Sequence, residues 1–359
     1  MVIFFQHERS FSLNTQKTSL HKLRYFFYIL MAAIFGWFLF MELFGADEQS
    51  ANRTSTAALY SGTFVWEKED GTSEEITVPG RYQVPAGETM VLTTTLPDNY
   101  DETAFAIRSS LQDVKFYIGG ELRTEYSTKE TRLVGKNSAS RYVFCPTSYK
   151  DAGKELRLEL TTYTSNYSGV VNSIYCGDQS AIWQIIFHQY GPSTFIGFFV
   201  LFSGMTIILF SMILGFLYHI NFDMEYLGWC MIMGAVWLLG ESKLRQILVP
   251  NASALGSLCF VMIILCPIPL LLYADSIQNG RHRRLYLIAG GIVLANFAFS
   301  SILYSTGIKD YIEMLPFGQV ILVAVFVMVF VHLFQYLHKS KYHTDRLLLV
   351  GLLLIMVCV

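Results

Sequence analysis

"TFIGFFVLFSGMTIILFSMILGFLY", residues 194–218, decides the character of this chain. The stretch contains 25 residues, and none of them is charged. A helix needs about 20 consecutive apolar residues to cross a bilayer. Inside lipid the backbone has no water to bond to, so it satisfies its own hydrogen bonds by forming a helix. The stretch therefore predicts a membrane-spanning helix.

Similar apolar runs precede and follow this one, at residues 25–44, 224–240, 254–273, 285–304, 314–337 and 347–359. We expect residues 194–359 to form a multi-helix membrane domain of six spans. Residues 25–44 are expected to be an anchor behind an N-terminal tail, residues 1–24. The alternative for the anchor is a cleavable signal peptide. The run of 20 residues, apolar apart from Glu42 near its end, exceeds the usual core of about 7–15, and a cut after Ala46 places the bulky Phe44 where a small residue is needed, so an uncleaved anchor is favoured.

The last run, residues 347–359, is short for a span. Its 13 residues would reach roughly 20 Å as a helix, against a hydrocarbon core of about 30 Å. We therefore expect the chain to be the front part of a longer protein, in which a seventh helix completes the membrane domain.

Charge separates a polar part from these apolar runs. Hydrophobic residues make up 53% of the chain, but residues 46–190 carry 19 acidic and 13 basic side chains, which is 32 of the 54 charges. This segment is expected to be one soluble domain. The net charge of -2 gives no sign of the basic face that nucleic-acid binding requires.

The orientation follows from the positive-inside rule. The N-terminal tail contains Arg9, Lys17, Lys22 and Arg24, which predicts a cytoplasmic N-terminus and an extracytoplasmic segment 46–190. The loops that then fall inside hold six Lys and Arg residues, and those that fall outside hold three. The chain is thus predicted to be a multi-pass protein of the plasma membrane.

Alternating apolar residues predict strands in the soluble segment. In "DVKFYIGGELRTEY", residues 113–126, Val114, Phe116 and Ile118 share one face. The chain then turns at Gly119-Gly120, a pair that permits the positive φ of tight hairpins. "TMVLTTTL" and "GKELRLELTTY" alternate in the same way, and turn-forming stretches separate them. The expected fold is an all-β jelly roll or β-sandwich attached to a membrane α-helical bundle.

These patterns resemble a known family. "DVKFYIGGEL" is similar to jelly-roll modules related to galactose-binding domains. "EYLGW", "VWLLGESKLRQ" and "LCPIPLLLYADSIQNGRHRRLYL" resemble bacterial seven-transmembrane receptors with diverse intracellular signalling modules. The closest resemblance is to the input half of membrane diguanylate cyclases. It implies a C-terminal GGDEF output domain, of which these 359 residues contain no trace.

Two features near helix ends are candidates for coupling. Glu241 and Arg245 lie four residues apart and would face each other on a continuing helix. They form either a polar latch between the outer domain and the bundle or a solvated interfacial pair. Pro267 and Pro269 in "CPIPLL" interrupt helical hydrogen bonding and mark either a hinge or a static kink.

Other candidate residues each have an ordinary alternative. Cys145 and Cys176 can form a disulfide in an oxidising exterior, or remain two buried thiols. His332 is ionisable within a membrane run, which favours function, but a neutral imidazole bonded to a neighbouring helix is sufficient. Aromatic residues of the outer domain either stack on sugars or serve as strand formers: Trp66, Tyr82, Tyr117, Tyr142, Tyr163 and Tyr167.

The sequence therefore predicts a transmembrane signal receptor that senses a small extracytoplasmic ligand, with a carbohydrate among the candidates. The alternatives are a membrane-anchored carbohydrate-binding or adhesion protein without signalling, and a transporter or membrane enzyme. The last is disfavoured because no Asp, Glu, Lys or Arg lies at the middle of a span. No catalytic, cofactor or metal motif appears. The expected partners are the lipid bilayer and the ligand, and a homodimer is left open.

Overall fold

The computed structural model describes residues 56–218 and 223–339, together with scattered positions between 26 and 40. The chain divides into two units, Met1–Thr54 and Ser55–Val359. The described positions between 26 and 40, within the predicted anchor, are helical. The predicted run 347–359 and the whole N-terminal tail, residues 1–24, lie outside the described residues.

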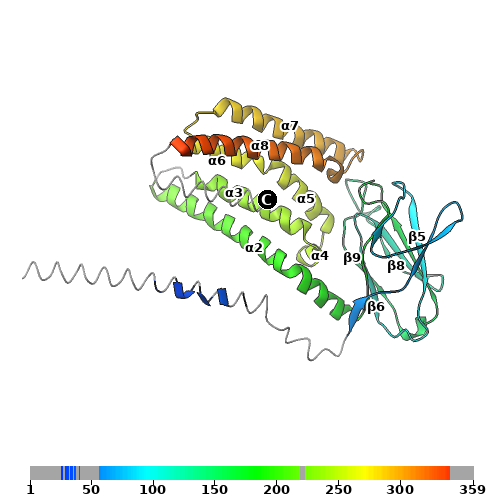
Figure 1. The fold of residues 1–359 in the computed structure, drawn as a ribbon. Helices are drawn as coiled ribbons and strands as arrows, with labels where there is room; N and C mark the ends of the chain where they lie inside the picture. Colours follow the sequence, from blue (N-terminus) through cyan, green and yellow to red (C-terminus); the bar gives the residue numbers. More distant parts are fainter. Residues whose placement is uncertain are drawn as a thin grey trace, which may run out of the picture. The chain divides into compact units, whose positions relative to one another are not determined.

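Residues 56–178 fold into antiparallel sheets. The strands are β1 (Ala57–Leu59), β2 (Phe64–Glu67), β3 (Ser73–Ile76), β4 (Gly80–Arg81), β5 (Thr89–Thr95), β6 (Ala104–Arg108), β7 (Asp113–Ile118), β8 (Glu121–Tyr126), β9 (Tyr142–Pro146), β10 (Glu155–Thr161), β11 (Val170–Val171) and β12 (Ile174–Gly177). Within this described segment, one sheet has the order β1-β12-β6-β9, a second has the order β3-β2-β5-β10-β7-β8, and β11 pairs with β4. Figure 1 labels several of these strands.

The predicted alternation is confirmed in the six-stranded sheet. Phe116 of β7 pairs with Leu158 of β10, which pairs in turn with Leu92 of β5, and all three side chains are fully buried. The four-stranded sheet adds Phe105 and Ile107 to the same core. Because one face of each sheet points into a common core, burial of these apolar side chains holds the sheets together.

The predicted hairpin between β7 and β8 is also confirmed. Gly119 and Gly120 have φ values of 57° and 84°. Side chains with a Cβ rarely adopt this left-handed conformation, so glycine at both positions suits a tight turn between two paired strands.

Helices follow the strands from residue 179 onward. They are α2 (Gln179–Tyr218), α3 (Met224–Glu241), α4 (Arg245–Leu248), α5 (Ala252–Leu265), α6 (Pro267–Ile277), α7 (Arg283–Ser305) and α8 (Tyr311–Lys339). α3 packs against α2, α5 and α6, while α7 and α8 contact each other and α6. At the contact of α2 with α3, Gly204 and Gly228 lie so close that a Cβ on Gly204 would come within 2.9 Å of the Gly228 carbonyl oxygen. Small residues of this kind let membrane helices approach closely.

Among the described helices, four segments are long and apolar enough to cross a membrane: Gln179–Tyr218, Ala252–Ile277, Arg283–Ser305 and Tyr311–Tyr336. The predicted run 224–240 does form a helix, α3, but its 18 residues are not among these segments. In the most apolar part of α2 only 11% of the residues are buried, and large side chains such as Phe195, Phe199 and Phe216 are exposed. An apolar surface of this extent is typical of a helical membrane protein and not of a water-soluble one.

Candidate functional site

Residues 127–141, here called the junction loop, connect β8 to β9 and supply half of the candidate site. The loop is held in shape by its own polar groups. The backbone N–H of Thr128 donates to Ser138 Oγ at 2.8 Å, and Ser138 Oγ donates in turn to the carboxylate of Asp113. Tyr126 OH donates to the Ala139 carbonyl at 2.6 Å. The loop is therefore a shaped segment that presents specific atoms to the helices.

One set of contacts joins the junction loop to the start of α8. The backbone N–H of Lys136 donates to Asp310 Oδ1 at 3.0 Å, and Asn137 Nδ2 donates to Asp310 Oδ2. Lys136 Nζ forms an ion pair with Glu313 at 3.0 Å. Asp310 precedes the first residue of α8, where a carboxylate also interacts favourably with the helix dipole. Thr164 Oγ1 adds a bond to Glu313 at 3.2 Å.

A second set of contacts joins the same loop to α4. Arg245 donates from Nε and Nη2 to the Ser140 carbonyl, at 3.1 and 2.7 Å, and from Nη1 to the Gly240 carbonyl at 3.1 Å. The neighbouring Gln246 exchanges two bonds with the backbone of Tyr142: it accepts from the N–H at 2.5 Å and donates to the carbonyl at 3.4 Å. The junction loop of the β part is therefore hydrogen-bonded both to the start of α8 and to α4.

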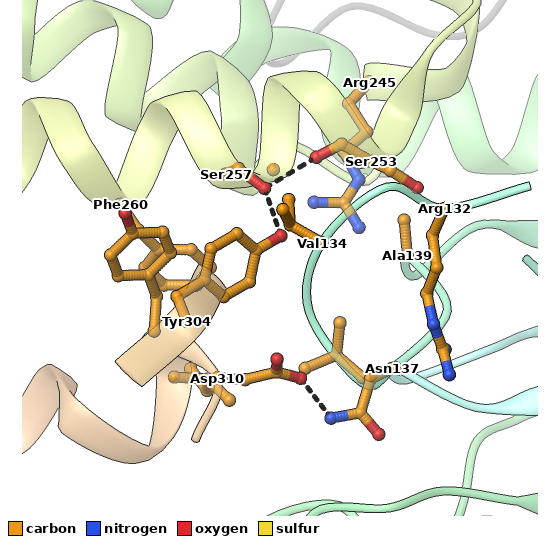
Figure 2. Close-up of a pocket in the computed structure, with 14 residues that line it drawn as sticks. Arg132, Val134, Asn137, Ala139, Arg245, Ser253, Ser257, Phe260, Tyr304 and Asp310 are labelled. Carbon is orange, nitrogen blue, oxygen red and sulfur yellow. Dashed lines mark hydrogen bonds between the residues drawn. The ribbon is translucent and has the colours of Figure 1, made fainter. Parts of the chain in front are cut away.

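A cavity of about 60 Å³ lies between these two sets of contacts. One wall is aromatic. The ring of Tyr311 stacks on that of Tyr304, with the centroids 4.4 Å apart, and on that of Phe260, with the centroids 6.3 Å apart. Tyr304 OH is 2.7 Å from Ser257 Oγ. Figure 2 shows this wall facing the residues of the junction loop. Further lining residues are Leu111, Arg132, Val134, Asn137, Ala139, Arg245, Ser253, Gly256, Asp310 and Ile312.

The cavity contains two guanidinium groups. Arg245 is only 7% exposed, and burial, helped by the nearby positive charge of Arg108, lowers its pKa although Glu241 opposes the shift. Arg132 Nη1 is buried and has no hydrogen-bond partner, and the guanidinium carbon lies 5.9 Å from the ring centre of Tyr163. Among the described residues, neither arginine has a carboxylate within ion-pair distance. Arg132 as a whole is half-buried. A buried cation such as Arg245 is costly unless hydrogen bonds or an anion compensate it.

The predicted pair Glu241 and Arg245 is separated by a break in the helix. α3 ends at Glu241, Ser242 adopts an extended conformation, and Arg245 begins α4. The four-residue spacing on one helix is therefore not realised, and Glu241 is exposed. Arg245 contacts the β part through Ser140 and α3 through Gly240.

Pro267 and Pro269 lie in the first turn of α6, directly after Cys266, which separates α5 from α6. α5 and α6 together form the single apolar segment Ala252–Ile277, within which neither proline can donate a backbone hydrogen bond to the preceding turn. Both side chains are buried. The proposed hinge stays a prediction.

Cys145 and Cys176 are free thiols in this structure. Cys145 of β9 and Cys176 of β12 both pair with Phe105 of β6, from opposite sides. Two strand spacings amount to roughly 10 Å between their Cα atoms, whereas a disulfide spans about 4.4–6.8 Å. The predicted disulfide is therefore not formed, because a strand lies between the two cysteines. Burial raises the pKa of each thiol to about 11.

Among the remaining predicted residues, Tyr163 contacts two that line the cavity: its ring lies beside Arg132, and its backbone N–H donates to Asn137 Oδ1 at 2.8 Å. The His332 ring stacks on His282 at 4.2 Å, and its Nδ1 is 3.4 Å from Tyr286 OH on α7. Trp66 and Tyr82 pack against the β core. Within the described residues no group of three His, Cys, Asp or Glu side chains is placed to hold a metal ion.

Sequence reasoning found Arg245 but missed Arg132, Asn137, Asp310 and Glu313. Asp310 and Glu313 stand in "KDYIE", between two apolar runs, where a carboxylate is ordinarily taken as solvated. No sequence signal pairs them with a loop more than 170 residues away.

The class defined by these observations is an antiparallel β region followed by apolar, membrane-type helices, with a charged cavity where the two meet. No family model matches the chain, and a search of curated proteins finds no match. The resemblance to seven-transmembrane signalling receptors therefore stays a prediction.

Proposed function

We propose that this protein is the input module of a membrane receptor. Residues 46–190, which contain the β region, would lie outside the cytoplasm, and the β region would sense a small ligand. Its helices would carry the signal to a cytoplasmic output, and the family resemblance favours a GGDEF diguanylate cyclase. The observation that carries the proposal is the polar network that joins one loop of the β region to both α4 and α8 around a cavity.

The positions of these contacts suit signal transmission. Asp310 lies in the turn between α7 and α8, so a movement of the junction loop acts directly on the ends of two long helices. From Tyr304 at the cavity to Arg284 at the start of α7, the helix extends about 30 Å. This is the length needed to relay a change across the hydrocarbon core.

The β region supports a binding role. Its two larger sheets share a core, as in the jelly-roll modules that its sequence resembles. Such sandwiches often bind ligands through the loops that connect their strands. Here a connecting loop lines the cavity, and this favours ligand binding at the junction over binding on the outer sheet face.

The test measures coupling between the junction and the far end of the helices. Spin labels at Arg284 and Gln335, both exposed, report the separation of α7 and α8 in the full chain in lipid nanodiscs. The variant Asp310→Asn replaces one of the two carboxylate oxygens that accept from the junction loop with a donor. If the junction controls the helices, this variant shifts the distance distribution between the labels.

The control is Asp98→Asn, the same change at an exposed position of the β region, which should leave the distribution as in the wild type. A distribution that is identical in wild type, D310N and D98N contradicts the receptor proposal. The remaining hypothesis is then a membrane-anchored binding or adhesion protein without signalling.

A further inference from the structure

Three apolar side chains are exposed where the junction loop meets the helices. Leu133 of the loop is 98% exposed, its neighbour Val134 is exposed as well, and so is Ile308 in the turn between α7 and α8. We call these three residues the apolar rim. Single exposed apolar residues are ordinary on a soluble surface, so the rim indicates a contact only if its position in the molecule supplies a partner.

Polar bonds hold the rim in a defined position. The backbone N–H of Lys136 donates to Asp310 Oδ1 at 3.0 Å, and the ammonium group of Lys136 pairs with Glu313 at 3.0 Å. Lys136 follows Val134 by two residues, and Asp310 follows Ile308 by two residues. The same bond therefore joins the two loops that carry the rim, directly beside it.

The junction loop meets α7 at the level where the hydrocarbon core ends. Gly135, next to Val134, approaches Tyr304 so closely that a Cβ on this glycine would come within 2.7 Å of the ring. Tyr304 lies ten residues from Leu294, the middle of the span Arg283–Ser305. Ten helical residues rise about 15 Å, which is half of a hydrocarbon core of about 30 Å. In a bilayer centred on this span, Tyr304 lies at the interface, where tyrosines are enriched.

The exposed surface of α7 identifies the partner at this level. Phe299 and Ile302, in the last two turns of the helix, are large apolar side chains that remain exposed. On a membrane-spanning helix such side chains face acyl chains, because exposed apolar surface of this extent marks contact with lipid or with another protein. Apolar side chains are thus exposed on α7 just before Tyr304 and on the loops beside it. The acyl chains that contact α7 therefore need only a small extension to reach the rim.

We propose that the apolar rim inserts into the bilayer leaflet on the side of the β region, among the acyl chains next to the headgroups. Insertion removes Leu133 from water, which is favourable in proportion to the apolar area that is covered. It also holds the junction loop at a fixed depth beside the turn between α7 and α8. The proposal goes beyond the receptor function and does not depend on it, since it requires only that the helices span the membrane.

Brominated acyl chains test the insertion, because bromine quenches tryptophan fluorescence only at short range. The full chain is placed in phosphatidylcholine nanodiscs with and without brominated acyl chains. Leu133→Trp adds one fluorophore to the five native tryptophans, whose signal is subtracted with the wild type. Leu122→Trp is the matched control, because Leu122 is also an exposed leucine but lies at the opposite end of β8 from the junction loop. We expect the added fluorescence of L133W to be blue-shifted and mostly lost to bromine, and that of L122W to be retained.

Photo-cross-linking repeats the test without an introduced tryptophan. The unmodified chain is irradiated in nanodiscs of a phosphatidylcholine with a diazirine on its acyl chain, and the adducts are mapped by mass spectrometry. We expect adducts at Leu133 and, as the internal positive control, at Phe299 of α7. Leu133→Asp should lose the loop adduct and keep that of α7.

Three results would overturn the proposal. The first is equal quenching of L133W and L122W. The second is a chain that takes lipid adducts on α7 and none on the junction loop. The third is an L133W signal that is blue-shifted but not quenched, which would show that protein and not lipid covers this position.

Discussion

Arg245→Ala is the most informative change at the junction. Arg245 is buried and donates to the backbone carbonyls of Ser140 and Gly240. Without this side chain, the Ser140 carbonyl of the β part loses both hydrogen bonds that it accepts from Nε and Nη2. Hydrogen bonds to charged groups contribute about 1.5–3 kcal/mol each, and in the wild type part of this gain is offset because the guanidinium is hydrated again when the junction opens. We therefore expect the junction to lose about 3 kcal/mol of local stability.

The expected loss is measurable by hydrogen exchange of the full chain in nanodiscs. A local opening free energy that falls by about 3 kcal/mol corresponds to a protection factor that falls by roughly 10²-fold. The amides to follow are those of Arg141, bonded to Ser109 Oγ, and Tyr142, bonded to Gln246 Oε1. Amides in β7 and β10 should keep their protection, because the core does not depend on the junction.

Lys243→Ala is the matched control for this experiment. Lys243 lies in the same connection between α3 and α4, but its Nζ donates to Tyr190 OH at 2.6 Å and makes no described bond to the junction loop. Its removal should leave the exchange of Tyr142 unchanged. If the Arg245 variant also leaves Tyr142 and Arg141 unchanged, the bonds across the junction contribute no stability and the reasoning is refuted.

Two further predictions concern acid stability and topology. Burial alone would raise the pKa of Asp151, but bonds from Lys154 and from the Ser148 N–H, with the charge of Arg123, hold it below its usual value, so its contribution is present at neutral pH and is lost as the pH falls below about 4. The difference in thermal midpoint between wild type and Asp151→Asn should therefore shrink between pH 7 and pH 3, and a constant difference would contradict this. A cysteine introduced at Ser73 should react with a membrane-impermeant reagent in intact cells while one at Ser340 should not, and the reverse pattern would invert the proposed topology.

The strands of the β core could be predicted because their signal is local. In β7 and β10 every second residue is buried, and a two-residue period is visible within six or seven positions of the sequence. The apolar helices are equally visible, since lipid requires long runs of apolar residues. Which strands pair with each other could not be predicted in this way. That β6 lies between β9 and β12, and so separates Cys145 from Cys176, depends on segments about 40 and about 70 residues away from β6 and on no local pattern.

The candidate site likewise combines a residue that the sequence singled out with residues that it did not. Arg245 was singled out by its spacing of four residues from Glu241. Its partner was not, because the prediction assumed that α3 continues past Glu241, although Gly240 stands one residue before the end of the helix. Arg132 and Asp310 lie in loops, which have no periodicity to read. They meet only because the tertiary fold brings the junction loop to the turn between α7 and α8.

This arrangement also explains how a ligand could act as a signal. A ligand shifts a conformational equilibrium only as far as its affinities for the two states differ. Arg132 belongs to the β part and Arg245 to the helical part, and both line the cavity. Because Lys136 and Asn137 of the same loop hold Asp310, docking of the loop constrains the turn between α7 and α8, and undocking releases it. A ligand that binds more tightly while the loop is docked would therefore constrain this turn.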